Sequence, residues 1–245
     1  MTALRYSQAA LILAVGYFIY QFTTHDYSAW GIQFRFLTIW GLTAAMVAHY
    51  LLFVARRNGR ADTYPAFISA TAVLNIMVVF LYWRLYFIDP ALVNGDNTPV
   101  WFQEYYLHLI GPAIILIEAL FISRAFDQML RGMGVTVALC VAFVVWTEGF
   151  VGPFNDTPVG SVTSGLTYPF LNDMDMGGRM NFYGTTIVTA LVFYLICWAV
   201  AWGMRKLRGY YTANQTQFAR NYSKSAPSLL DVHRGKNAHR ACHGP

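Results

Sequence analysis

Charged residues are scarce in this sequence. Only 12% of its 245 residues are Asp, Glu, Lys or Arg, whereas 56% are hydrophobic, and the mean hydropathy is +0.40. A soluble domain carries about twice that charged fraction. The composition therefore excludes an ordinary soluble protein and indicates a membrane protein. A chain of this length has room for one compact bundle of helices and not for a second large domain.

Cysteines are few and the common cofactor motifs are absent. Cys140 and Cys197 lie in apolar segments and Cys242 lies in the polar C-terminal segment, so the sequence offers no external disulfide framework. No CxxCH, Walker, GxGxxG or HExxH motif occurs. The formal charge of +5 does not indicate nucleic-acid binding, because the basic residues cluster beside apolar runs, as they do in membrane proteins. We expect no cofactor and no nucleic-acid partner.

Long apolar runs dominate the sequence. A run of about 20 apolar residues crosses about 30 Å of hydrocarbon as an α-helix. The first run is not a signal peptide by its pattern, because no small-residue cleavage site follows it and further runs do. The sequence thus predicts an all-α, polytopic membrane protein with six transmembrane helices. The runs cover about residues 6–23, 33–55, 64–87, 104–126, 133–151 and 181–204.

Basic residues mark one side of the predicted bundle. They follow the second, fourth and sixth runs, whereas the loops after the third and fifth runs carry acidic residues and little positive charge. Because loops rich in Arg and Lys stay in the cytoplasm, we expect these three ends, and with them both termini, to be cytoplasmic. The basic positions are Arg56, Arg57, Arg60, Arg124, Arg131, Arg205, Lys206 and Arg208, and the acidic positions are Asp89, Asp96, Asp156, Asp173 and Asp175.

Two polar segments fall outside the apolar runs. Residues 152–180 are rich in Gly, Pro, Thr and Asn, which predicts an ordered cap over the bundle rather than a seventh span. Inside this cap, the apolar patch 168–171 is expected to fold back onto the helices. Residues 205–245 are polar and basic, and their composition predicts a cytoplasmic tail that is mostly disordered. We therefore divide the chain into a transmembrane domain, 1–204, and a basic tail, 205–245.

Ionisable side chains inside the apolar runs are few. Each costs about 2.5 to 3.5 kcal/mol on insertion scales, so each needs a partner, a cavity or a function. Thr38 and His108 both lie about 6 to 8 Å below the outer end of their helix and can share a level. Arg84 and Glu148 also lie at similar heights, and an ion pair between them would offset both burial costs. The ionisable residues are Arg35, His49, Arg84, His108, Glu118 and Glu148, with Glu104 and Arg124 at the ends of runs.

The shared depth of Thr38 and His108 has two interpretations. In the first, the hydroxyl bonds its own helix backbone and the imidazole makes an ordinary interhelical bond. In the second, Thr38 is a nucleophile and His108 is its general base, which requires the two groups to lie about 2.6 to 3.2 Å apart. Spacing along the chain does not decide between them.

Histidines could also indicate haem or metal. His49 lies eleven residues beyond Thr38 on the same run, which is about 16 Å of helix. One haem between His49 and His108 therefore does not fit, although one of them paired with another type of ligand is a further option. A cluster in the flexible tail is a weak metal pattern, and we expect no metal site. This cluster consists of His233, His239, Cys242 and His243.

Three stretches, in order, resemble a known family. They are Phe36, Leu37 and Thr38; His108 followed by Pro112 and the run from Ile115 to Glu118; and Tyr168 to Leu171 followed by Gly178, Arg179, Phe182 and Gly184. On matching spans, these stretches resemble the androgen-induced gene 1 and androgen-dependent regulator family (FAR-17a/AIG-like) of multi-pass membrane threonine hydrolases. The resemblance covers roughly residues 30–204 and is that of a distant, bacterial-type member.

The resemblance implies hydrolysis of lipid esters, notably fatty-acid esters of hydroxy fatty acids. Thr38 would be the nucleophile and His108 the base, near the outer face of the membrane. Either Arg35 or backbone N–H groups under the outer cap would stabilise the oxyanion. Membrane lipids are the expected partners, in a plasma membrane or bacterial inner membrane. The residues expected to bind substrate or support the site are Arg35, Arg84, Glu148 and Tyr168.

An alternative from another class is a non-catalytic accessory subunit of a larger respiratory or photosynthetic membrane complex. Its helices and the 205–245 tail would contact neighbouring subunits, and the 7 Trp and 16 Tyr residues suit such contacts. A transporter is a weaker alternative, because it needs helices broken by Gly or Pro at matching positions in two halves. Only Gly111 and Pro112 offer such a break.

Overall fold

The computed structural model describes residues 2–24, 27, 29–94, 100–155 and 165–225. These residues form helices joined by turns and loops, and they include no β-strand, so the prediction of an all-α fold is confirmed. Asp96, Asp156 and the tail cluster with His233, His239, Cys242 and His243 lie outside the described residues. The elements are α1 (Ala3–Thr24), η1 (Ile32–Arg35), α2 (Leu37–Arg57), α3 (Pro65–Ile88), α4 (Ala91–Asn94), α5 (Trp101–Tyr105), η2 (Tyr106–Ile110), α6 (Gly111–Ile117), η3 (Glu118–Ile122), η4 (Ala125–Asp127), α7 (Met129–Trp146), η5 (Thr147–Val151), α8 (Gly152–Phe154), α9 (Pro169–Asn172) and α10 (Met176–Ser225).

Five helical stretches in the described part are long and apolar enough to cross a membrane. They correspond to the second to sixth apolar runs. The first run forms α1, which has 22 residues but is not one of the five. In the fourth stretch, Met129–Phe154, only 11% of the apolar 18-residue segment is buried within the protein. Such an apolar surface needs lipid or another protein to cover it. The chain is thus a helical membrane protein. The five stretches are Leu37–Arg57, Pro65–Ile88, Trp101–Ile122, Met129–Phe154 and Met176–Thr212.

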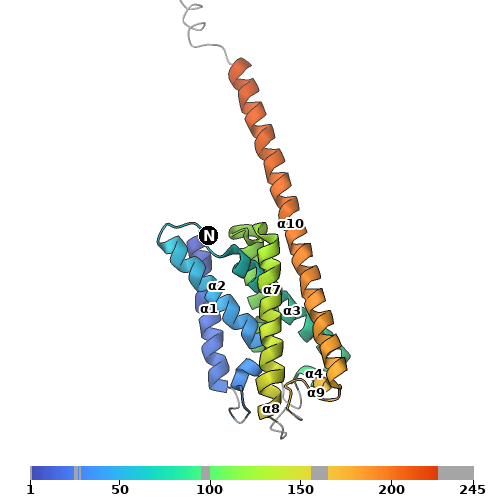
Figure 1. Ribbon diagram of the computed structural model, residues 1–245. Coiled ribbons are helices and arrows are strands. Elements are labelled where there is room, and N and C mark those ends of the chain that lie inside the picture. Colours follow the sequence, from blue (N-terminus) through green and yellow to red (C-terminus); the bar gives the residue numbers. More distant parts are fainter. Residues whose placement is uncertain (1, 25–26, 28, 95–99, 156–164, 226–245) are drawn as a thin grey trace, which may run out of the picture. The chain divides into compact units, whose positions relative to one another are not determined.

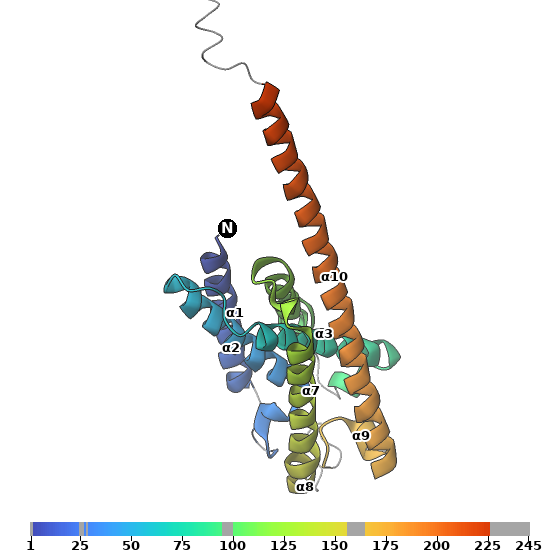
Figure 2. The same ribbon diagram turned by 45° about the horizontal axis from the view of Figure 1, so that its top comes forward.

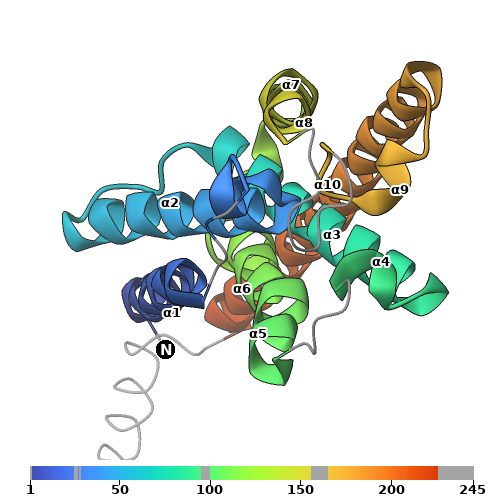
Figure 3. The same ribbon diagram turned by 90° about the horizontal axis from the view of Figure 1, so that it is seen from below.

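Helix α3 is the centre of the bundle (Figures 1 and 3) and packs against α2, α6 and α7. The apolar 18-residue segment of α3 is 61% buried within the protein, which is the largest buried share among the five stretches. The first half of α3 explains this position, because Ser69, Ala70, Thr71 and Ala72 are small and have no exposed surface. Small side chains let neighbouring helices approach closely in a membrane, where packing rather than hydrophobicity holds helices together.

Helix α1 lies alongside α2 (Figure 2). Ala10 and Ala14 are buried and stand four residues apart, so they share one face of α1. Ala14 packs in a cluster with Leu42 of α2 and Tyr106 of η2. The ring of Tyr17 stacks on that of Tyr106 at 3.6 Å. A narrow face of small residues thus fixes α1 against the helices that carry the candidate site.

The chain divides into two compact units, Met1–Ala201 and Trp202–Pro245. Within the second unit α10 is helical as far as Ser225. The prediction of a mostly disordered tail is therefore wrong for residues 205–225. No proline interrupts this stretch, and many of its residues, such as Arg, Lys, Leu and Gln, favour helix. The rest of the tail, 226–245, lies outside the described residues.

A buried ion cluster ties α1, α2 and η3 together at the end of α2. The guanidinium of Arg56 donates to both carboxylate oxygens of Glu118, at 2.7 and 3.1 Å, and to Asp62 at 2.7 and 2.8 Å. It also donates to the carbonyl oxygen of Ala3 at 3.0 Å. Glu118 has no exposed surface, so its charge depends on Arg56 for compensation.

We expect Arg56→Met to lower the free energy of unfolding by about 3 to 5 kcal/mol, because the change leaves the buried carboxylate of Glu118 without its partner. Denaturant titration of the purified protein in detergent micelles measures this loss. Arg57→Met is the matched control, since Arg57 is the next residue and is exposed. Equal stabilities of the two variants would show that the cluster does not hold the helices together.

Candidate functional site

Thr38 and His108 meet near one end of the bundle. Thr38 stands in the first turn of α2, and its Oγ1 lies 3.3 Å from Nε2 of His108 on η2. His108 is 6% exposed and Thr38 is half-buried. The structure therefore brings together the two residues that the sequence places at one depth. A distance slightly above 3.2 Å is common between catalytic groups without substrate.

Pro112 positions the backbone of His108. A proline has no N–H, so it cannot bond the carbonyl four residues earlier, which belongs to His108. The helix adjusts by forming the π-helical turn η2, in which the N–H of Gly111 bonds the carbonyl of Tyr106. The freed carbonyl of His108 accepts a hydrogen bond from the indole Nε1 of Trp83 on α3 at 2.9 Å. The local sequence thus both creates the irregular turn and anchors it.

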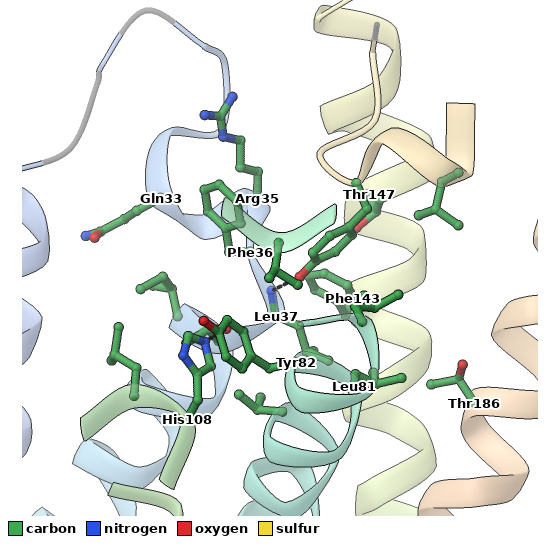
Figure 4. A pocket seen from close by; sticks show the side chains of 18 of the residues that line it. Gln33, Arg35, Phe36, Leu37, Leu81, Tyr82, His108, Phe143, Thr147 and Thr186 are labelled. Atoms are coloured by element: carbon green, nitrogen blue, oxygen red, sulfur yellow. Dashed lines mark hydrogen bonds between the residues drawn. The ribbon is translucent and has the colours of Figure 1, made fainter. Parts of the chain in front are cut away.

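Two neighbours hold the imidazole ring. The ring of Tyr82 on α3 stacks on that of His108 at 3.5 Å with an interplanar angle of 7° (Figure 4). On the other edge, Nδ1 of His108 lies 3.1 Å from Oε2 of Glu104, at ion-pair distance though not aligned as a hydrogen bond. A proton on Nδ1, facing the carboxylate, leaves Nε2 as an acceptor toward Thr38, which is the tautomer that a general base needs.

Glu104 is a site residue that the sequence interpretation missed, since it was placed only at the end of a run. The available signal is its spacing of four residues before His108, which puts both side chains on one helix face. Tyr82 carries no such signal, because its contact with His108 joins two different helices.

The described part of the cap, at Thr167 and Tyr168, contacts the end of η1 and the first turn of α2. The backbone N–H of Leu37, at the start of the helix, donates to the hydroxyl oxygen of Tyr168 at 3.3 Å, drawn as a dashed line in Figure 4. Burial raises the pKa of Tyr168 to about 12, and the hydrogen bond from Leu37 partly opposes this rise. The phenol therefore keeps its proton at neutral pH and can donate a hydrogen bond of its own.

The apolar patch 168–171 packs on the helices, as predicted. Leu171 is buried in a cluster with Leu166 and Tyr183, and Tyr168 and Phe170 pack against that cluster. The cap is also tied down by polar contacts, because Thr167 donates through its hydroxyl to the carbonyl of Arg35 at 3.2 Å.

The expected ion pair between Arg84 and Glu148 is wrong. Arg84 is exposed, while Glu148 lies 3.0 Å from Nε of Arg179 and accepts a hydrogen bond from Tyr183 at 2.7 Å. Both of these partners are on α10. The height of a residue along its span can be counted from the sequence, but the direction in which it faces around the helix depends on the packing.

Arg35, the fourth expected support residue, is buried at the end of η1. Its guanidinium lies 5.1 Å from the centre of the Phe36 ring. In Figure 4 it points away from His108. It therefore lines the site without facing the Thr38 and His108 pair.

A cavity of about 650 Å³ opens beside Thr38 and His108. This volume suits one medium-sized organic ligand or part of a lipid. Of the expected site residues, Arg35 and Tyr168 also line it, and Arg84 and Glu148 do not. Other lining residues include Tyr20, Gln21, Thr24, Gln33, Leu37, Val78, Leu81, Tyr82, Leu85, Gln103, Glu104, Leu107, Cys140, Phe143, Val144, Thr147, Phe170, Leu171, Phe182, Tyr183, Thr186 and Ile187.

Metal-ligating side chains do not gather in the described part of the chain, where no three His, Cys, Asp or Glu residues form a group that could hold an ion. His49 is buried on α2 and is not among the residues that line the cavity. The cavity wall instead carries the imidazole of His108, the carboxylate of Glu104 and the phenol of Tyr168, a set suited to acid–base chemistry.

Comparison with known proteins gives one family. No curated protein and no solved structure matches the chain. The profile of the FAR-17a/AIG1-like protein family matches residues 2–201. This match includes η1, α2, η2 and the cap, which carry the residues of the candidate site. Because it covers well over half of the sequence, the chain belongs to the FAR-17a/AIG1-like protein family.

Proposed function

We propose that this protein is an integral membrane hydrolase that cleaves lipid esters with Thr38 and His108. The observation that carries the proposal is the 3.3 Å distance between Oγ1 of Thr38 and Nε2 of His108 at the wall of a 650 Å³ cavity. A threonine hydroxyl is a weak nucleophile by itself, and a base at this position is what activates it.

The reaction follows from these positions. Nε2 of His108 takes the hydroxyl proton while Oγ1 of Thr38 attacks the ester carbonyl, giving a tetrahedral intermediate. The intermediate collapses to an acyl-threonine, and His108 returns the proton to the leaving alcohol. Water then attacks the acyl-threonine with His108 again as base, which releases the fatty acid and restores Thr38. The carboxylate of Glu104 keeps the ring in the required tautomer and stabilises the imidazolium in both steps.

The N-terminus of α2 is the best candidate for stabilising the oxyanion. Thr38 stands in the first turn of this 21-residue helix, where the backbone N–H groups and the helix dipole favour negative charge. The protonated hydroxyl of Tyr168 lies against the same turn and supplies a further donor. Of the two sources considered from the sequence, the geometry favours these groups over Arg35, whose guanidinium points away from His108 (Figure 4).

In the proposed topology, α1 is a sixth span and both termini are cytoplasmic. The basic residues at the ends of the second, fourth and sixth apolar runs support this orientation. Thr38 then lies near the outer membrane surface, at the level of lipid ester groups. A substrate can reach the cavity sideways with its chain still in the bilayer of a plasma membrane or bacterial inner membrane.

An activity-based probe tests the proposal. The purified full-length protein in lipid nanodiscs is treated with a long-chain fluorophosphonate, and the modified peptide is identified by mass spectrometry. We expect hydrolysis of long-chain esters and modification of Thr38, with excess ester slowing the labelling. Labelling at another residue would remove the mechanism. Absence of hydrolysis, with stable co-purification of other membrane subunits, would favour the accessory-subunit alternative.

A further inference from the structure

One end of the cavity carries buried amide groups without hydrogen-bond partners. Gln33 on η1 has no exposed surface, and neither its Nε2 nor its Oε1 bonds to any group in the described residues. Gln21 on α1 is 7% exposed, and its Nε2 also has no partner there. Both residues line the cavity. An unsatisfied buried polar group costs about 1 to 3 kcal/mol, so these atoms indicate a place where a ligand bonds.

These amides lie on the side of the cavity formed by α1. The ring of Phe34, the residue after Gln33, contacts the rings of Phe18 and Phe22 on α1 at 6.2 and 6.3 Å. Figure 4 shows the amide of Gln33 pointing away from Thr147. We call this end of the cavity the amide subsite, defined by Gln21 and Gln33.

Among the described residues, those of the amide subsite carry no charge. A carboxamide both donates and accepts hydrogen bonds, so its natural partner is a neutral group that does the same, such as a hydroxyl. The two charged residues on the cavity wall are engaged elsewhere: Arg35 lies over the ring of Phe36 and Glu104 faces His108. The subsite therefore suits an uncharged alcohol better than a carboxylate or a phosphate.

The other side of the cavity is mainly apolar, although Thr147 and Thr186 also line it. Phe143 and Val144 on α7, Phe170 on α9, and Phe182 and Ile187 on α10 line it. In the view of Figure 4, His108 lies between Gln33 on one side and Phe143 on the other. A chain of CH₂ groups gains about 0.8 kcal/mol for each one buried on such a wall. An ester held at Thr38 would thus have its acyl chain on the apolar side and its alcohol part toward the amide subsite.

We infer that the amide subsite binds the hydroxyl-bearing alcohol part of a neutral polyol ester, such as a monoacylglycerol. This inference rests on the proposed hydrolase function and adds a substrate class to it. Gln33 supplies one donor and one acceptor, and Gln21 supplies a second donor. An ester of a simple alcohol leaves all three atoms unpaired, and a site built to bond hydroxyl groups discriminates against such an analogue.

Turnover of two esters with the same acyl chain tests the inference. For the wild-type protein in nanodiscs, we expect kcat/KM for 1-oleoylglycerol to exceed that for methyl oleate by about tenfold or more. Gln33→Leu should reduce this ratio to about one, because leucine makes no hydrogen bond to the glycerol hydroxyls. Equal wild-type kcat/KM values for the two esters would overturn the inference, as would an unchanged ratio in Gln33→Leu. Either result would mean that the unpaired amides bond water and not substrate.

Gln8→Leu is the matched control. It makes the same change at an exposed position of α1 and should keep the wild-type ratio. If Gln8→Leu lowered the ratio as much as Gln33→Leu does, the preference would not come from the amide subsite.

Binding without turnover separates this inference from the proposed function. In the Thr38→Ala background, 1-O-octadecylglycerol, an ether that cannot be hydrolysed, should raise the Tm, and octadecyl methyl ether should not. Adding Gln33→Leu should abolish the rise. This binding pattern without hydrolysis of any ester would support the amide subsite and refute the hydrolase. If instead both esters were hydrolysed at equal rates and neither ether showed this binding pattern, the hydrolase would be supported and the amide subsite refuted.

Discussion

Thr38→Ala is expected to lower kcat/KM for a long-chain ester by about 10³-fold or more, because the change removes the hydroxyl beside Nε2 of His108 that forms the acyl intermediate. The loss should fall on kcat, since the cavity that binds the acyl chain is unchanged. Stopped assays of fatty-acid release from ester-loaded nanodiscs measure both constants. The fluorophosphonate should no longer modify the protein.

Thr43→Ala is the matched control for this change. Thr43 stands on the same helix, and its hydroxyl donates to the carbonyl of Ile39 at 2.7 Å. This is the ordinary role of a hydroxyl in a membrane helix, and Thr43 does not line the cavity. Its loss should leave turnover near the wild-type level. Turnover by Thr38→Ala within about tenfold of that of Thr43→Ala would remove Thr38 from the mechanism.

The helices of this protein could be predicted from its sequence because lipid imposes a simple rule. Only a helix satisfies its own backbone over 20 residues of hydrocarbon, so apolar length alone locates α2, α3 and the later spans. The rule gives no information on side-chain contacts, which explains why it could not show that α3 is central. It also fails beyond the membrane, where composition predicted a disordered tail and α10 continues to Ser225.

The candidate site shows what counting residues can and cannot give. Depth along a helix is fixed at 1.5 Å per residue, so Thr38 and His108 could be placed at one level. Rotation around the helix is not fixed in this way. The same count paired Arg84 with Glu148, which instead bonds Arg179 and Tyr183.

Irregular turns add an error that counting cannot detect. Residues 106–110, 118–122 and 147–151 are π-helical, and each such turn shifts the register of the residues that follow. Each of the three contains one His or Glu side chain that is buried or partly buried: His108, Glu118 or Glu148. A Gly-Pro pair directly follows the first and the third of these turns, at 111–112 and 152–153, and signals both, whereas no such pair follows the second.

The acidic partner of His108 follows from the structure, and its contribution can be separated from that of the fold. Glu104 lies one helical turn before His108, with Oε2 3.1 Å from Nδ1. A carboxylate there favours the tautomer with the proton on Nδ1 and stabilises the imidazolium that forms during each step. A glutamine at this position has nearly the same shape, but its NH₂ group can donate to Nδ1 and so favour the tautomer in which Nε2 carries the proton. That tautomer cannot remove the proton of Thr38.

We therefore expect Glu104→Gln to lower kcat by about 10²- to 10⁴-fold and to leave KM within about threefold, because the change affects the base and not the apolar wall. Steady-state kinetics in nanodiscs and the Tm of the same samples measure these effects.

Asp89→Asn is the control, since Asp89 is an exposed acid just beyond the end of α3. This change should alter neither kcat nor KM. A purely structural carboxylate would instead lower the Tm and alter kcat and KM together. A Glu104→Gln protein with kcat within about twofold of the wild type would show that His108 acts without this carboxylate.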